Sequence, residues 1–457
     1  MPSPRMTDFF DSSMRALTQG LRRGALAPLD IAEAVIERTR TAGDTYRVWS
    51  GFDPEVLRAQ AREAKDRLDA GKPVRPLEAM PVAVKDIFNT VAYPTEMGSP
   101  LWAGFTPGND ARAVYNLKRA GAMVAGKTTT AEFAVHYLPD TYNPHDVLRN
   151  PGTSSTGSAV ATALAVTPMA LGTQTAGSIV RPASFCGVWG CKPSYGLIPR
   201  TGVLKTTDTL DSIGFYVVHA EDLGLALDAV RVSGRDYPML HETLEDPARQ
   251  AVPQGRKWKV AFARTHTWDL APGYARAAME EWVARLSREA EVEVVEIDLP
   301  AGMERCHDIH EAVYHRCLAY YFQQEYKSTE RLSPIMQEII AYGQGIPDQT
   351  YRDGLAEQSR LAAEMDSLLA GYDAMVSLST AGEAPPREVT ETRDPALMWT
   401  MTWLPVVSAP AFTGPTGLPF GAQLVARRYN DHRLFRLVDH LVARGCLPAG
   451  PNPRVRS

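Results

Sequence analysis

Two short loops rich in glycine and hydroxyl side chains could support nucleophilic chemistry. They are residues 152–158 (GTSSTGS) and residues 172–178 (GTQTAGS). In the second loop Thr175, Ala176 and Gly177 directly precede Ser178, and small residues let the backbone turn tightly and a ligand approach it. Successive N–H groups in such a turn converge on one point and favour negative charge there. With Ser178 as a nucleophile, the amides of residues 175–178 would form an oxyanion hole, in which one donor is worth about 100- to 1000-fold in rate.

A serine hydroxyl needs a base to remove its proton. The chain lacks the GxSxG signature of many serine hydrolases, and none of its ten histidines is close to either loop in sequence. A Ser-His-Asp triad stays open, because folding could bring a distant histidine to Ser178. The other candidate base is Lys85, with Ser154 or Ser155 of the first loop passing the proton between them.

Lys85 belongs to a run of β-branched and small residues, 81–87 (PVAVKDI), that predicts a strand. Strand alternation would place Lys85 on the face opposite to Val84 and Asp86. An inward-facing lysine among apolar neighbours is desolvated, which lowers its pKa. A fall from about 10.4 to about 7 costs about 4 kcal/mol, an amount that full burial can supply.

These motifs resemble the amidase signature family of serine amidohydrolases, which use a Ser–cis-Ser–Lys triad. The first loop corresponds to the family's Gly-Gly-Ser-Ser-Gly-Gly-Ser stretch, and Ser178 follows Ser154 by the 24 positions that separate the two serines in the family. The resemblance is weakest at 230–400. It continues through residues 81–86 (PVAVKD), 181–183 (RPA), 186–188 (CGV), 192–194 (KPS) and 417–424 (GLPFGAQL).

The resemblance implies a role for each matching residue. Ser178 would be the acyl-accepting nucleophile, Ser154 the bridging serine after a cis peptide bond, and Lys85 the base that later returns its proton to the leaving amine. The oxyanion hole would comprise the backbone N–H groups of Thr175, Ala176, Gly177 and Ser178. Thr153 and Arg181 are the candidates for substrate binding. The family needs no metal or organic cofactor, so none is expected here.

Several positions depart from the family pattern without removing a triad residue. Thr153 and Thr156 replace glycines of the first loop, and Ala176 replaces one in the second. Gln174 stands where many members have aspartate, and Arg181 lies one position later than the arginine usual after Ser-Ile. If that aspartate and arginine normally pair, Arg181 must find another partner in this chain.

The elements that would position these residues indicate an α/β protein. By resemblance we expect the amidase signature fold, with a mixed, twisted β-sheet covered by helices on both sides. No linker or repeat is visible, so residues 1–457 are expected to form one domain. Its parts would be N-terminal helices at 1–70, a signature core at 75–230 and a variable helical cover of the pocket at 300–400. Strands are also predicted at 121–126, 257–263, 292–297 and 421–426, and helices at 111–119, 158–166, 273–290 and 433–443.

Composition limits the classes of partner. The chain has 457 residues, 44% hydrophobic and 22% charged, and a net charge of −5, which excludes disorder and argues against nucleic acid or an anionic membrane as a partner. The stretch 151–180 has no charged residue, but its hydroxyls, Gln174 and Pro168 indicate a buried interior rather than a membrane span. Five cysteines without a CxxC pair indicate reduced thiols, and with no visible signal peptide they favour the cytoplasm. The group between Cys306 and Cys317 is expected to line core or pocket rather than hold a metal.

The sequence therefore predicts an amidohydrolase that cleaves the C–N bond of a small-molecule amide, as a monomer or a homodimer. A carbamate or ester hydrolase with the same triad is an alternative, because the oxyanion geometry accepts any acyl carbon. Another is the amidase subunit of a glutamine-dependent tRNA amidotransferase. The short stretches at 137–150 and 411–417 argue against that role. An idle scaffold that kept the fold is the third, and the intact Lys85, Ser154 and Ser178 argue against it.

Overall fold

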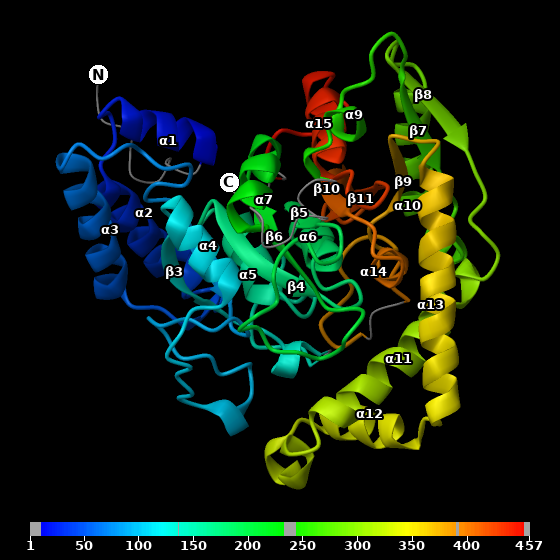
Figure 1. The fold of residues 1–457 in the computed structure, drawn as a ribbon, viewed down its shortest axis with the longest axis horizontal. Helices are drawn as coiled ribbons and strands as arrows, with labels where there is room; N and C mark the ends of the chain where they lie inside the picture. The colour runs from blue at the N-terminus through cyan, green and yellow to red at the C-terminus, as the bar shows by residue number, and fades with distance from the viewer. Residues whose placement is uncertain (1–10, 136, 233–243, 390–392, 452–457) are drawn as a thin grey trace.

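One mixed β-sheet runs through the whole molecule (Figure 1). The computed structural model describes residues 11–135, 137–232, 244–389 and 393–451. Within them eleven strands form the sheet in the order β1-β3-β2-β4-β6-β5-β10-β11-β9-β7-β8. The strands are β1 (Trp49–Gly51), β2 (Pro81–Lys85), β3 (Met123–Thr128), β4 (Met169–Gln174), β5 (Trp189–Lys192), β6 (Ser212–Val217), β7 (Trp258–Phe262), β8 (Val292–Glu296), β9 (Ala374–Leu378), β10 (Val406–Thr413) and β11 (Pro419–Val425).

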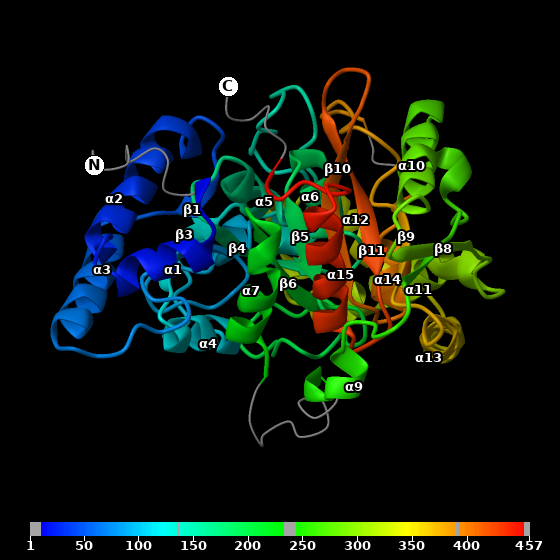
Figure 2. The same ribbon diagram turned by 90° about the horizontal axis from the view of Figure 1, so that it is seen from above.

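Helices lie on both sides of this sheet, as Figures 1 and 2 show. The larger ones are α1 (Met14–Arg22), α2 (Pro28–Arg38), α3 (Pro54–Asp69), α4 (Arg112–Ala120), α5 (Thr156–Ala163), α6 (Val180–Cys186), α7 (Leu223–Val230), α10 (Gly273–Leu286), α11 (Cys306–Tyr321), α12 (Pro334–Gly345), α13 (Asp348–Leu369) and α15 (Asp431–Ala443). Two short helices are α9 (Pro247–Gln250) and α14 (Leu397–Met401). The predicted fold class, a mixed sheet covered on both sides by helices, is confirmed.

The sheet contains two parallel groups of strands, with antiparallel strands between them and the antiparallel edge strand β1 beside β3. β2 runs parallel to both β3 and β4, and β7 runs parallel to both β8 and β9. Between these two groups β6, β5, β10 and β11 form antiparallel pairs with their neighbours. The base candidate Lys85 ends β2, and the second loop begins in the last three residues of β4 and continues beyond them. Because parallel strands end at the same edge of a sheet, this pairing brings Lys85 and the second loop together.

The elements that were predicted agree with the structure to within a few residues, but six of the eleven described strands were not predicted: β1, β4, β5, β6, β9 and β10. The N-terminal part contains α1, α2 and α3 as expected, but also the edge strand β1, which the helical prediction lacks. The uncharged stretch at 151–180 contains a helix, α5, and also the strand β4, which was not predicted. Among the described helices none is long and apolar enough to cross a membrane.

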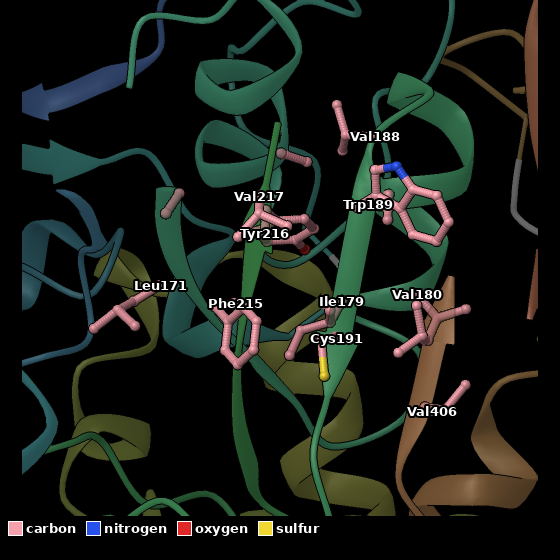
Figure 3. Packing of buried hydrophobic residues seen from close by; sticks show 14 of the residues in the cluster. Leu171, Ile179, Val180, Val188, Trp189, Cys191, Phe215, Tyr216, Val217 and Val406 are labelled. Carbon is pink, nitrogen blue, oxygen red and sulfur yellow. The ribbon is translucent and has the colours of Figure 1, made fainter. Parts of the chain in front are cut away.

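Buried hydrophobic side chains pack together around β4, β5 and β6 (Figure 3). Ile179, the residue directly after Ser178, is fully buried there beside Cys191. Gly214 leaves room for it, since a Cβ at position 214 would lie 2.7 Å from Ile179 Cδ1. The downstream end of the second loop is therefore anchored in the hydrophobic core.

Candidate active site

Lys85 is completely buried and is surrounded at its tip by hydroxyl groups. Its Nζ lies 2.8 Å from Ser154 Oγ, 2.8 Å from Thr173 Oγ1 and 3.1 Å from Ser155 Oγ. Among the described residues no carboxylate forms an ion pair with it. The expected inward orientation is confirmed, and the amine contacts both serines that the sequence offered as a bridge. The expected apolar neighbourhood does not extend to the amine itself, because hydroxyls surround it.

Burial lowers the pKa of Lys85 well below its ordinary value, and the more distant negative charge of Asp211 opposes this effect. The Ser155 hydroxyl donates to the Thr173 carbonyl oxygen at 3.0 Å, so at Lys85 it must accept. A neutral amine has two N–H donors and one lone pair. With one N–H directed to Ser155, the lone pair faces either Ser154 or Thr173, and both hydroxyls are free to donate to it.

The first loop is closed by its own side chains. The peptide bond between Thr153 and Ser154 is cis, as the resemblance implies. Thr156, a departure from the family glycine, donates from Oγ1 to the Gly152 carbonyl at 2.8 Å, and the Ser154 carbonyl accepts from Thr130 Oγ1 at 3.1 Å. Compared with the family glycine, Thr156 thus allows fewer backbone conformations but adds a hydrogen bond that closes the loop.

In the second loop every carbonyl from residue 175 to residue 178 is held by the protein. Thr175 O accepts from His310 Nε2 (2.9 Å), Ala176 O from Thr400 Oγ1 (2.7 Å), Gly177 O from the Arg181 amide (2.9 Å) and Ser178 O from the Tyr216 hydroxyl (3.1 Å). The four backbone N–H groups of the same residues donate to no other described residue. The loop therefore has its acceptors satisfied and its donors unused, which is the arrangement that an oxyanion requires.

Gln174 explains how the loop keeps this shape without the aspartate usual in the family. Its Oε1 accepts from the backbone N–H groups of Ile179 (2.8 Å) and Val180 (3.0 Å), while its Nε2 donates to Thr400 Oγ1 at 3.0 Å. A carboxylate could accept the same two amides but could not donate to Thr400. The carboxamide thus ties the start of α6 to the threonine that holds Ala176.

Ser178 lies between these contacts with its side chain unengaged. The residue is 6% exposed, and its hydroxyl forms no hydrogen bond with a described residue, Ser154 included. The structure thus joins Lys85 to Ser154 directly, whereas the second contact of the predicted relay is absent from the described part of the chain. Catalytic hydrogen bonds often tighten only when substrate is bound, so this geometry leaves Ser178 as a candidate.

Arg181 connects the two loops through a partner that the sequence analysis missed. The buried guanidinium donates to Asp394 Oδ2 at 2.8 Å and to the Thr153 carbonyl at 2.9 Å. Asp394 is itself buried and also accepts from the Ala396 amide at 2.7 Å. The question of how Arg181 is satisfied without the family aspartate is answered by Asp394.

Gly177→Ala is expected to disrupt this connection. A Cβ at position 177 would lie 1.8 Å from Asp394 Oδ2 and 2.4 Å from its Cγ, so the carboxylate would have to leave Arg181. We expect a loss of about 1–3 kcal/mol in the free energy of unfolding together with most of the activity. Thermal unfolding and turnover would be measured beside Gly273→Ala, where a Cβ meets nothing within 4 Å. Equal behaviour of the two variants would contradict this account.

A cavity of about 510 Å³ opens beside the two loops. Thr153, Ala176 and Arg181 form part of its wall, so the candidate substrate-binding residues do reach it. The rest of the wall comes mainly from α11 and from the segments 387–389 and 393–397. It includes Leu138, His307, His310, Tyr314, His315, Ile335 and Leu397. Its size suits a small molecule. The segments at 137–150 and 300–400 thus shape the pocket.

Several residues that build the site were not singled out from the sequence. Thr173 lay within the second loop but had no signal of its own, whereas Asp394 and Thr400 belong to the region least like the family. His310 was noticed only as a member of the group between Cys306 and Cys317, not as a partner of the second loop. Asp211 accepts from Thr175 Oγ1 at 3.0 Å and so orients the first of the four residues, 175–178, whose amides are unused. Only the folded arrangement shows that these residues meet.

The group between Cys306 and Cys317 lies on α11. Cys306 and His307 are buried there, and His307 donates from Nε2 to the Asp394 carbonyl at 3.0 Å while its Nδ1 lies 2.9 Å from His266 Nε2. No three His, Cys, Asp or Glu residues in the described ranges are grouped so as to hold a metal ion. The histidines of α11 therefore serve the pocket wall and the loops behind it.

Comparisons with known proteins agree with this architecture. A family model described as Amidase matches residues 30–435. The chain is 32% identical over 456 residues to a glutamyl-tRNA(Gln) amidotransferase subunit of Thermus thermophilus, covering 91% of this chain and 93% of that protein. The crystal structure of an amidase matches with a TM-score of 0.84 and 26% identity over 95% of this chain and 100% of that one. Native peptide amidase from Stenotrophomonas maltophilia matches in fold with a TM-score of 0.84 at 23% identity, covering 98% and 99% of the two chains.

Proposed function

The chain belongs to the amidase family, and we propose that it is a stand-alone amidohydrolase that cleaves the C–N bond of a small-molecule amide. The observation that carries the proposal is the arrangement of residues 175–178 in the second loop. Their four carbonyls accept hydrogen bonds from the protein, while their four backbone N–H groups, which include that of Ser178, donate to no described residue. A buried lysine whose amine contacts hydroxyl groups supplies the matching base.

In the first half of the proposed reaction the substrate carbonyl oxygen binds to the amides of residues 175–178. Ser178 Oγ attacks the carbonyl carbon and gives its proton to Ser154 Oγ, which gives its own to the neutral Lys85 amine. The resulting oxyanion is stabilised by the loop amides, and the ammonium by its three hydroxyl neighbours. Lys85 then returns the proton through Ser154 to the leaving nitrogen, the C–N bond breaks, and an ester on Ser178 remains.

The second half repeats the same proton path with water. Water replaces the amine, loses a proton through Ser154 to Lys85 and attacks the ester carbon. Collapse of this second oxyanion releases the carboxylic acid and returns the proton to Ser178. Atoms and charges balance, because each half-reaction leaves Lys85 neutral again.

A serine-directed reagent tests the nucleophile directly. We expect a fluorophosphonate to form a stoichiometric covalent adduct, which peptide mass spectrometry would place on Ser178. Heat-denatured protein is the control, because without the loop amides and the desolvated lysine no serine should react. An adduct on another serine, Ser154 included, would refute the assignment.

Carbamates and esters could use the same site, since the loop amides recognise the oxyanion rather than the leaving group. A panel of short acyl amides, aryl amides, amino-acid amides, carbamates and esters would separate these substrate classes. The proposed partner is thus a small molecule, and a homodimer is compatible with it.

The amidase subunit of a glutamine-dependent tRNA amidotransferase is a second candidate, favoured by the 32% identity to the Thermus thermophilus protein. Gel filtration of native extract distinguishes the two. A stable complex with other polypeptides would support this second candidate, whereas elution as a monomer or homodimer with amidase activity would support the stand-alone enzyme.

A further inference from the structure

A second cavity, of about 640 Å³, shares no residue with the 510 Å³ cavity beside the two loops. It is formed by α9, the start of β7, the residues after α13 and the start of α15. In Figure 1 these elements lie toward the top, whereas α11 and α12 lie toward the bottom. Its wall contains six cationic side chains: Arg249, Arg256, Lys257, Lys259, Arg427 and Arg433.

Three of the six cations form ion pairs with two carboxylates, those of Asp373 and Asp366. Asp373 has a fully buried side chain and receives Arg256, at 2.7 and 2.9 Å, and Arg433. Asp366 receives Arg427 Nε at 3.0 Å. One carboxylate thus serves two guanidinium groups, which leaves this side of the wall with excess positive charge.

The other three cations, Arg249, Lys257 and Lys259, form no ion pair with any described residue. Arg249 Nε donates to the neutral Asn430 Oδ1 at 2.7 Å, and Lys259 Nζ lies 5.1 Å from the centroid of the Tyr372 ring. Burial and the nearby charge of Arg427 lower the pKa of Arg249.

The carboxylates on the wall do not cancel this charge. Asp246 Oδ1 is used to cap α9, accepting from the Ala248 amide at 2.9 Å, and Glu293 is the other acidic residue of the wall. Counting Asp373 and Asp366 as well, six cations face four carboxylates, a surplus of two positive charges.

We propose that this cavity binds the phosphate group of a small molecule. A phosphate monoester carries about −1.5 to −2 charges at pH 7 and has three acceptor oxygens, which matches a surplus of two. Guanidinium groups bind such oxyanions with paired N–H donors, and ammonium groups add point charges. A monocarboxylate would neutralise only half of the surplus. The proposal does not depend on the catalytic role of Ser178, because the two cavities share no residue.

Isothermal titration calorimetry of the full chain at constant ionic strength tests the proposal, with inorganic phosphate and adenosine monophosphate as separate titrants. We expect one binding site per chain, and Lys257→Gln combined with Lys259→Gln should weaken the affinity at least tenfold. The matched control is Lys72→Gln combined with Lys327→Gln, which removes two exposed positive charges elsewhere. Circular dichroism verifies that both double variants are folded.

The comparison of titrants also identifies the ligand class. Tighter binding of adenosine monophosphate would indicate an organic phosphate, and equal binding would indicate recognition of the phosphate alone. Absence of binding heat with both titrants would overturn the proposal. So would an equal loss of affinity in both double variants, or no loss in the variant of the cavity.

Discussion

Ser178→Ala is expected to reduce kcat by about 10⁶-fold, the loss typical of removing the nucleophile from a serine hydrolase. The substitution removes the oxygen that would form the ester. Among residues 175–178 the other hydroxyl is that of Thr175, and it already donates to Asp211 at 3.0 Å. Because the Ser178 hydroxyl forms no hydrogen bond with a described residue, its removal should leave the stability nearly unchanged. The loop amides should still bind the substrate carbonyl.

Steady-state turnover, thermal unfolding and substrate binding together check this prediction. The matched control is Ser367→Ala on the exposed face of α13, where the hydroxyl bonds to the carbonyl of Ala363 in its own helix. That variant should retain full activity. If Ser178→Ala kept activity within tenfold of the native enzyme, another group would have to be the nucleophile.

The catalytic candidates could be predicted because they lie in short, local motifs. Glycines and serines at fixed spacing specify the loops that hold Ser154 and Ser178, and a run of β-branched residues specifies the strand that ends at Lys85. Local patterns of this kind depend on neighbouring residues alone. The contact between Lys85 and Thr173 then follows from the pairing of β2 with β4, whereas Ser154 reaches Lys85 from the first loop, before α5.

The strand β4 was missed for a physical reason. All its residues are buried, so the alternation of polar and apolar residues that marks a half-exposed strand is absent. Its sequence, MALGTQ, also lacks β-branched residues apart from Thr173, and a buried run of this kind cannot be distinguished from a helix by periodicity.

The groups that shape the oxyanion loop were also beyond the sequence. His310, Thr400 and Tyr216 hold three of its carbonyls from three separate elements, α11, α14 and β6. Nothing in the local sequence of any of them indicates this contact, because it depends on how the helical cover packs against the sheet. Of the three hydroxyls around Lys85, only that of Thr173 was missed, since it reaches the amine from β4.

Lys85→Met is expected to lower kcat/KM by about 10²- to 10⁴-fold, the contribution typical of a general base. The matched control is Lys192→Met, which removes another fully buried lysine, one whose Nζ donates to the carbonyls of Pro193 (3.1 Å) and Leu404 (2.6 Å). That variant leaves two carbonyls without this donor and should lose about 1–3 kcal/mol of stability. Its folded fraction should keep its activity, because the hydrogen bonds of Lys192 go to carbonyls outside both loops.

The pH dependence distinguishes a base from a merely structural lysine. Burial lowers the pKa of Lys85, so activity should rise with pH as the amine loses its proton and then reach a plateau. Between this lowered pKa and about 10.4 the unfolded chain binds one proton more than the native protein, so this group makes stability rise by about 1.4 kcal/mol per pH unit. Below the lowered pKa both states are protonated and the slope vanishes. The difference in stability between native enzyme and Lys85→Met should show this slope, whereas a difference that does not change with pH would mean that the buried amine keeps its proton and cannot act as the base.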